Sequence, residues 1–322
     1  VKWQKPYGQA WNRSFPPART TATIEGGRAF VISGMGVVSC MDAATGEKIW
    51  TRDAFTEFDG QYGSWGIAES PLIVDGKVIF TPGGKKATMV ALDKMDGDVV
   101  WASKSIGDKP AYCSPIAVER GGKKIIITIV AEHILGVNAA DGEILWSYAC
   151  KNYQKKIKGI NTTTPLYKDG SVYITSGYDM GSVRLDIAED GSSVKKAWEN
   201  HDLDVHHGGV VLVDGYIYGS SWHNNRSGNW VCVDWESGKT MYDTEWHNKG
   251  QIIYADGMLY CYDEHRKGGN FGLVKASPKR FDVVSEFKIE KGDGVHWAHP
   301  AISDGVLYVR HENYLMAYDI SE

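Results

Sequence analysis

One spacing recurs along this 322-residue chain and limits its folds more than any other feature. An Asp or Asn is followed four residues later by Gly and eight residues later by Trp. The spacing occurs first in VVSCMDAATGEKIW at residues 37–50, and again in the segments that end at Trp101 and Trp146. Weaker copies lie around Asp186 and Asp234. Such recurrence predicts a repeat architecture, in which each repeat is one small structural unit.

A second pattern alternates with the first along the chain. It consists of two apolar segments joined by an Asp-Gly turn, which is the strongest short-range signal for a β-hairpin. Each repeat of roughly 40 to 50 residues therefore contains two hairpins, or four antiparallel strands, as is typical of a β-propeller blade. The five Asp-Gly copies begin at Ser70, Thr164, Val210, Ile252 and His299.

These repeats predict an all-β fold, with a single β-propeller domain over residues 1–322 built from four-stranded antiparallel blades. We count seven blades. The segment Val1–Trp3 reads as an outer strand and residues 315–320 as a third strand, so pairing of the N- and C-terminal strands would close the ring and remove an exposed edge. Eight blades are the alternative if an upstream segment belongs to the protein. We expect the repeated Trp to pack between neighbouring sheets.

Composition and charge exclude two classes of partner. The net charge of −5 and the scattered Lys and Arg residues provide no basic surface for nucleic acid. The sequence has no apolar run of the roughly 18 to 20 residues that a transmembrane helix needs. The chain begins at Val1 instead of Met, from which we expect an upstream segment, such as a signal or anchor peptide, that has been removed or was never included.

The repeat, as in Ala91–Asp93 followed by Trp101, resembles the pyrroloquinoline-quinone-like (PQQ-like) propeller repeat family. That family includes quinoprotein alcohol and sugar dehydrogenases, proteins labelled polyvinyl-alcohol-dehydrogenase-like, and the propeller lipoprotein of the bacterial outer-membrane assembly machinery. The resemblance covers the whole chain and implies a propeller in the periplasm or outside the cell. For the dehydrogenases it implies PQQ and calcium, an adjacent-cysteine disulfide, a Trp beneath the quinone, Glu and Asn on calcium, and a catalytic Asp.

Only part of that quinone site has counterparts in this chain. The five cysteines include no adjacent pair, and no Asp stands at an obvious matching position. Glu69 and Asn161 are the candidate calcium ligands, and Trp222 or Trp297 is the candidate ring for stacking on a flat ligand. PQQ and calcium are therefore cofactor hypotheses without a complete motif, and a transition metal is less favoured than either.

The ten histidines supply a separate indication of a site. In a four-stranded blade, the loop between the second and third strands and the connection to the next blade lie at the same end. All ten histidines fall in or beside these loops, where binding and catalysis are usually found. With the Arg, Glu, Lys and aromatic residues before the first strands, they predict a mouth for an oxygen-rich, anionic small molecule.

We assign roles to the residues at this predicted mouth. The predicted catalytic residues are His206, His207, His299 and Tyr112. The predicted cofactor-binding residues are Arg19, Glu69, Thr162, Trp222, His223, Lys249, His296 and Trp297. His207 and His299 are the candidate ligands of a transition metal. For Glu69, an ion pair with Arg19 or Lys249 is favoured over a general-base role.

Three function hypotheses remain open at this point. The first is a quinoprotein-like oxidoreductase that acts on an alcohol or a sugar. The second is a non-catalytic propeller scaffold for protein–protein interaction in the cell envelope. The third is a carbohydrate-active, lyase-like propeller that uses His and Tyr. The number of histidines at one end favours a small-molecule site over a scaffold.

Overall fold

The computed structural model describes residues 1–15 and 19–321 of the chain. They form seven antiparallel sheets in chain order, in which every strand pairs with the strand that follows it in the same sheet. The first six sheets have four strands and the seventh has three. The predicted fold class, an all-β propeller with seven blades, is confirmed. None of the helices in the described ranges is long and apolar enough to cross a membrane.

The residues divide into two compact units, and each is described by itself. Unit 1 comprises residues 1–152, 157–172 and 186–195, and unit 2 comprises residues 153–156, 173–185 and 196–322. The fourth sheet is divided between them. Its strands are β13 (Leu166–Lys168), β14 (Ser171–Thr175), β15 (Ser182–Ile187) and β16 (Val194–Asn200).

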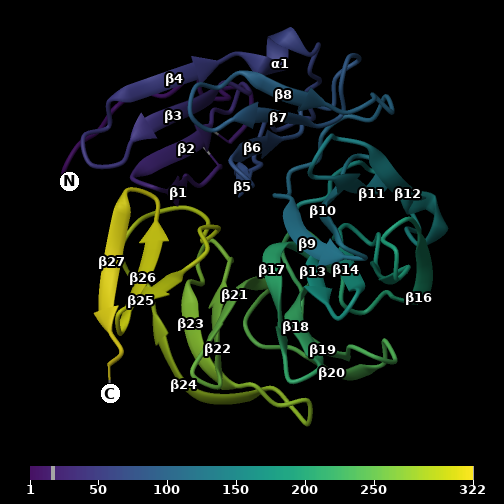
Figure 1. The fold of residues 1–322 in the computed structure, drawn as a ribbon. Helices are drawn as coiled ribbons and strands as arrows, with labels where there is room; N and C mark the ends of the chain where they lie inside the picture. The colour runs from purple at the N-terminus through teal and green to yellow at the C-terminus, as the bar shows by residue number, and fades with distance from the viewer. Residues whose placement is uncertain (16–18, 322) are drawn as a thin grey trace. The chain divides into compact units, whose positions relative to one another are not determined.

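Unit 1 contains the first three sheets (Figure 1). The first strands of successive sheets lie beside one another, β1 next to β5 and β5 next to β9, as in a propeller. A short helix, α1 (Ala54–Glu57), follows the first sheet. The strands are β1 (Thr23–Glu25), β2 (Arg28–Ile32), β3 (Val38–Asp42), β4 (Lys48–Arg52), β5 (Leu72–Val74), β6 (Lys77–Phe80), β7 (Val90–Asp93), β8 (Val99–Ala102), β9 (Ile116–Arg120), β10 (Lys123–Ile129), β11 (His133–Asn138) and β12 (Ile144–Ala149).

Unit 2 contains the last three sheets (Figure 1). Here β17 lies beside β21, and this contact builds the site described below. The strands are β17 (Val205–Val213), β18 (Tyr216–Ser221), β19 (Trp230–Asp234), β20 (Thr240–Thr244), β21 (Gly250–Ala255), β22 (Met258–Asp263), β23 (Asn270–Lys275), β24 (Asp282–Lys288), β25 (Ala301–Ser303), β26 (Val306–His311) and β27 (Tyr314–Asp319).

The Asp-Gly turns have the geometry that the sequence predicts. At the turn between β5 and β6, Asp75 has φ 47° and Gly76 has φ 74°, and Asp256 and Gly257 repeat this between β21 and β22. Two successive residues with positive φ define the type I′ turn, whose twist matches that of the strands it joins. These turns fix the pairing register of the first two strands in each sheet.

The repeated Trp joins one sheet to the next. Trp50 on β4 packs on Gly97 of the second sheet, where a Cβ atom would lie 2.8 Å from the indole ring. The Nε1 atom of Trp50 donates to the carbonyl of Lys94, at 3.1 Å. Trp101 repeats this contact with Gly142 and the Ala139 carbonyl in the third sheet. The predicted packing role of the Trp is therefore confirmed.

The third sheet makes this junction differently. The Nε1 atom of Trp146 is buried and has no hydrogen-bond acceptor within residues 1–15 and 19–321. The matching turn after Asp186 is one residue longer than the corresponding turns of the first three sheets. Its carbonyls at Ile187 and Ala188 instead accept hydrogen bonds from Arg120, each at 3.2 Å.

The segment Val1–Trp3, predicted to be an outer strand, has no strand assigned to it. Pro6 follows closely and has no backbone N–H, so any ladder here is short. Trp3 nevertheless occupies the position of an outer-strand Trp, because it packs on Gly46 and donates to the Ala43 carbonyl at 3.1 Å.

Candidate functional site

Most of the histidines gather in unit 2. We call the end of each sheet at which its first strand begins the histidine end. Only His133 precedes residue 196, so nine of the ten histidines belong to unit 2. The strand bounds place all ten in or beside the loops at the histidine end. These residues are His133, His201, His206, His207, His223, His247, His265, His296, His299 and His311.

His206 and His207 are neighbours in the irregular first half of β17. Successive residues of a regular strand point to opposite faces, but the pairing of β17 with β18 shifts register between Val205 and Val210. The two imidazole rings contact each other at an interplanar angle of 49°, with centroids 4.2 Å apart. The Nε2 atom of His206 is 2.7 Å from the hydroxyl of Tyr178. The irregular pairing of β17 therefore lets the side chains of two adjacent histidines lie on the same side of the strand.

A buried ion pair stands against these histidines. The Lys249 ammonium contacts Oε1 of Glu264, and the two side chains are 2% and 7% exposed. The other carboxylate oxygen, Oε2, lies 3.2 Å from Nε2 of His207. The backbone N–H of Glu264 donates to the Lys249 carbonyl at 2.9 Å, which holds the pair together. Glu264 was not among the residues that the sequence singled out.

Burial keeps both imidazoles neutral near pH 7. It lowers the pKa of His206 to about 3, and the neighbouring His207 adds to this effect. Burial also lowers the pKa of His207 to about 3, with contributions from His299 and Lys249. Burial raises the pKa of Glu264, and the Lys249 ammonium opposes that shift. The cluster therefore presents neutral nitrogens beside a carboxylate.

His299 contacts His207 through the backbone. Its Nε2 atom lies 2.8 Å from the carbonyl oxygen of His207. A carbonyl only accepts hydrogen bonds, so this Nε2 carries the proton and cannot bind a metal. Of the predicted metal pair, His207 is grouped with His206 and Glu264 instead. Trp297 packs its ring on His207, at 5.4 Å between centroids.

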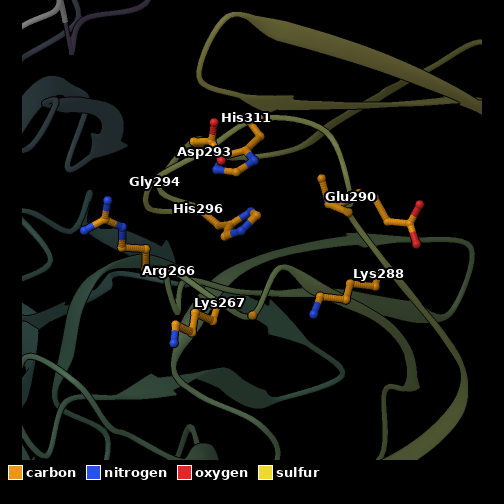
Figure 2. A pocket seen from close by; sticks show the side chains of 11 residues that line it. Arg266, Lys267, Lys288, Glu290, Asp293, Gly294, His296 and His311 are labelled. Atoms are coloured by element: carbon orange, nitrogen blue, oxygen red, sulfur yellow. The ribbon is translucent and has the colours of Figure 1, made fainter.

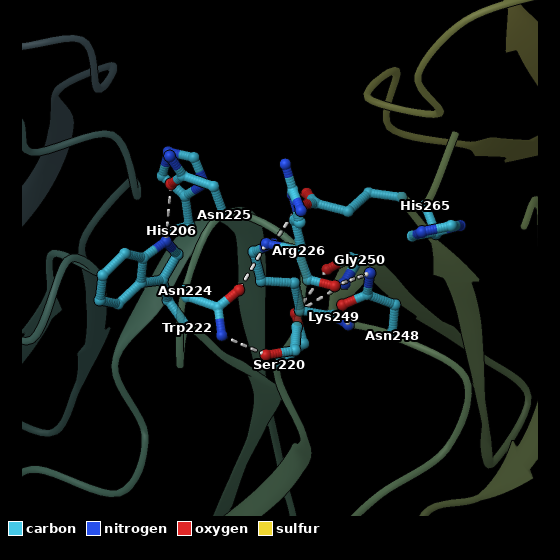
Figure 3. A network of polar contacts seen from close by, with 12 residues as sticks. His206, Ser220, Trp222, Asn224, Asn225, Arg226, Asn248, Lys249, Gly250 and His265 are labelled. Atoms are coloured by element: carbon cyan, nitrogen blue, oxygen red, sulfur yellow. Dashed lines mark hydrogen bonds and ion pairs between the residues drawn. The ribbon is translucent and has the colours of Figure 1, made fainter. Parts of the chain in front are cut away.

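The loop between β18 and β19 covers the same end of unit 2 (Figure 3). Trp222 packs on Tyr178 at 5.2 Å and donates from Nε1 to Asn225 at 3.3 Å. Asn224 and Ser227 form hydrogen bonds across the loop. The side chains of His223 and Arg226 are exposed. The predicted residues Trp222, His223, Lys249 and Trp297 therefore all belong to the region around His207.

His296 lies at a separate cavity of about 500 Å³ (Figure 2). Three basic residues, Arg266, Lys267 and Lys288, line this cavity together with two acidic ones, Glu290 and Asp293. The ring of His296 stacks on that of His311 with centroids 3.7 Å apart. Burial lowers the pKa of His296 to about 4, and His311 contributes to the shift. His311 was one of the ten histidines predicted at this end but had no role assigned, because no local pattern marks its contact with His296.

Tyr112 and Arg19 lie in unit 1, where both contact other residues of the chain. Arg19 donates to the carbonyls of Trp65, Ser14 and Phe15, which occupies its guanidinium. Tyr112 is buried, and burial raises its pKa. A hydroxyl that acts as acid or base must reach the substrate, so these surroundings favour a structural role for Tyr112.

Glu69, in unit 1, has neither of the ion-pair partners predicted for it. Its carboxylate accepts hydrogen bonds from the backbone N–H of Thr81, at 3.0 Å, and from the Thr81 hydroxyl, at 3.2 Å. It is 3% exposed, and burial raises its pKa from the ordinary 4.5 to about 8. The ion-pair prediction was wrong because Lys249 pairs with Glu264 and Arg19 with carbonyls. Glu69 therefore keeps its proton at neutral pH.

This protonation predicts a pH effect on stability. Between pH 4.5 and about 8, Glu69 is ionised in the unfolded chain and protonated in the folded one. Its contribution is full below pH 4.5 and is lost as the pH rises, by up to about 1.4 kcal/mol per unit. Urea unfolding should therefore show Glu69→Gln gaining stability relative to the wild type from pH 5 to pH 8. The exposed control Glu47→Gln should show no such trend, and a parallel trend in both variants would contradict the assignment.

The residues of unit 1 that were named for calcium already make hydrogen bonds within the chain. The Glu69 carboxyl group accepts from the backbone N–H and from the hydroxyl of Thr81. The Nδ2 atom of Asn161 donates to the Val130 carbonyl at 2.8 Å. Thr162 is half-buried beside it. The five cysteines are all buried, and no two are adjacent in the sequence; they are Cys40, Cys113, Cys150, Cys232 and Cys261.

Comparison with known proteins identifies relatives of one kind and a wider group that shares the fold. Residues 3–244 match the sequence model of a family described as outer membrane protein assembly factor BamB. The BamB of Yersinia pestis is 25% identical over 254 residues, which are 75% of this chain and 60% of that protein. The chain spans less than two thirds of the length of the curated relatives it matches.

Solved structures show the same fold at lower identity. The crystal structure of BamB from Moraxella catarrhalis has a TM-score of 0.67 and 16% identity, over 93% of this chain and 81% of that one. A europium-containing methanol dehydrogenase has a TM-score of 0.60 and 13% identity, over 90% of this chain and 72% of that one. These similarities concern the fold alone.

Proposed function

The chain belongs to the family of the outer membrane protein assembly factor BamB, and from this premise we propose that it is a non-catalytic scaffold. In this proposal it works in the periplasm or outside the cell and binds another protein of the envelope. The partner class follows from the printed name of its relatives, which is that of an assembly factor. The scaffold thus takes precedence over the small-molecule enzyme that the histidines favoured.

The observation that carries this proposal is the loop between β18 and β19 (Figure 3). The loop is ordered by its own hydrogen bonds, and Asn248 adds a donor to the Arg226 carbonyl at 2.8 Å. It presents His223 and Arg226 to solvent beside a partly buried Trp222. Trp297, on a neighbouring connection, is 38% exposed. Trp and Arg are enriched among residues that dominate protein interfaces, and a rigid loop loses little entropy on binding.

Two features weigh against the dehydrogenase alternative. The donors of Arg19 and the carboxylate of Glu69 are already engaged within the chain. The amide group of Asn161, the other residue named for calcium, donates a hydrogen bond to the Val130 carbonyl. The cavity beside His296 supports a second candidate, the binding of a small anion, because the basic residues Arg266, Lys267 and Lys288 outnumber the acidic Glu290 and Asp293 in its lining.

Site-specific cross-linking in cells of the source organism tests the scaffold proposal. A photo-activatable residue at His223 should capture an outer-membrane assembly protein, identified by mass spectrometry. The same residue at the exposed Lys239, in the turn between β19 and β20 at the opposite end of the sheet, should not. The double variant Trp222→Ala/Arg226→Ala should weaken binding of the captured partner by at least about 10-fold.

Either of two results would contradict the scaffold. One is equal capture from His223 and Lys239, which would mean that the loop has no special role. The other is calorimetric binding of PQQ at micromolar concentration or tighter, with or without calcium, which would favour the dehydrogenase class. Circular dichroism and thermal unfolding of each variant show whether it keeps the fold.

A further inference from the structure

We propose that His206, His207 and Glu264 form a binding site for a divalent first-row transition-metal ion, with Zn²⁺ as the reference ion. One ligand atom of each residue lies within 4.8 Å of the other two. Two imidazoles and a carboxylate are a donor set that zinc takes in sites with an open position. Calcium and magnesium prefer oxygen ligands alone, so the imidazoles select against them.

The contact between His207 and Glu264 is the first support for this site. The Nε2 atom of His207 is buried and makes no hydrogen bond within the described part of the chain, although Oε2 of Glu264 is only 3.2 Å away. Two ligands held by one tetrahedral zinc ion at about 2.1 Å lie roughly 3.4 Å apart. The observed separation is therefore close to that of two ligands of one ion. The ligand atom of His206 lies within 4.8 Å of the other two.

The charge arrangement directs one carboxylate oxygen at the histidines. Lys249 contacts Oε1 of Glu264, which leaves Oε2 on the side of His207. The ammonium therefore holds the Glu264 carboxyl group in place without occupying the oxygen that faces the histidines.

The backbone brings the three residues together. A Cβ atom on Gly208 would lie 1.8 Å from the carbonyl oxygen of Gly250, so only glycine lets β17 approach β21 this closely. The hydroxyl of Ser220 donates to the Gly250 carbonyl at 2.7 Å and fixes this approach. Two of the ligands lie on β17, and the third, Glu264, directly follows β22, which pairs with β21. The close approach of β17 to β21 therefore fixes the positions of the three ligands.

The surroundings complete the site. Tyr178 lies 2.7 Å from Nε2 of His206 and is placed to orient that ring, as outer-sphere partners of metal ligands do. The ring of Trp297 packs on His207 and covers it. Three protein ligands leave one position of a tetrahedral ion for water or an anion.

Calorimetric titration of the chelator-treated protein with Zn²⁺ tests the site. We expect about one ion per chain to bind with micromolar affinity or tighter. His207→Ala and Glu264→Gln should each weaken binding by at least about 100-fold, and Tyr178→Phe by about 10-fold. His247→Ala, which removes an exposed histidine that lies beside Glu286, should change the affinity less than about 3-fold. Co²⁺ in place of Zn²⁺ should give a tetrahedral absorption spectrum that is lost in Glu264→Gln.

The same titrations can overturn the assignment. His299→Ala should keep most of the affinity, because its Nε2 is bonded to the His207 carbonyl. If His299→Ala removes binding while Glu264→Gln retains it, the ligands are not the three named here. Binding that survives both His207→Ala and Glu264→Gln in folded protein, or no binding by the wild type, also overturns the proposal. Thermal unfolding identifies any variant that has lost the fold. His206→Asn is then used in place of that variant, because it also removes one of the three ligands.

Discussion

Trp101→Ala is expected to lower the free energy of unfolding by about 3–5 kcal/mol, among the largest effects of any single change in unit 1. The indole ring is 7% exposed, packs on Gly142 of the next sheet and donates a hydrogen bond to the Ala139 carbonyl at 3.1 Å. Removing it leaves a cavity at the junction of two sheets and an unpaired carbonyl. Urea unfolding followed by fluorescence and circular dichroism measures the change.

A matched pair of Phe variants separates packing from hydrogen bonding. Trp101→Phe loses the bond from Nε1, which contributes roughly 0.5–1.5 kcal/mol. Trp146→Phe loses no such bond, because its Nε1 has no acceptor among the residues that the structure describes. We therefore expect Trp101→Phe to cost more than Trp146→Phe. The reverse order would show that the repeated Nε1 contact has no energetic weight.

Lys249→Met is expected to lower the free energy of unfolding of unit 2 by about 3–5 kcal/mol. The substitution keeps most of the side-chain volume but leaves the Glu264 carboxylate, 7% exposed, without its cationic partner. A buried charge without a partner is far more costly than a lost surface ion pair. Chemical unfolding of the chelator-treated protein measures the cost.

Two further variants test whether the cost arises from the stranded carboxylate. Lys249→Met/Glu264→Leu should recover most of the lost stability, since both charges are then removed together. Lys196→Met breaks an exposed pair with Glu199, in which each side chain is 39% exposed, and should cost less than about 1 kcal/mol. A double variant no more stable than Lys249→Met would assign the cost to packing instead.

The fold was predictable because its signals are local. Asp75-Gly76 and the four other Asp-Gly pairs specify their turns through the φ angles of two residues, whatever the rest of the chain does. Asp42 likewise accepts hydrogen bonds from the backbone N–H groups of Ala44 and Thr45, which explains why Asp opens the longer turn. Each of these signals acts within a few residues, and repetition makes it visible in the sequence.

The candidate site was predictable only in part, because its decisive contacts are long-range. The histidine pattern predicted the end of the sheets at which His206 and His207 lie, and the positions before the first strands indicated Lys249. Glu264 joins them only because Gly208 lets β17 approach the backbone of Gly250, which no local pattern reveals. The hydrogen bonds of Glu69 with Thr81 and of His299 with the His207 carbonyl likewise join residues that are not neighbours in the sequence.

The contact of Trp with the glycine of the following sheet also bears on how such a chain can be lengthened, shortened or recombined. The side chain that seals a junction and the glycine that receives it belong to consecutive sheets, as with Trp50 and Gly97. A segment exchanged between homologous genes must therefore carry an indole at one border and a matching glycine at the other. Segments exchanged with both partners present keep the contact between neighbouring sheets. A segment that ends between the Trp and its glycine loses that contact at the border.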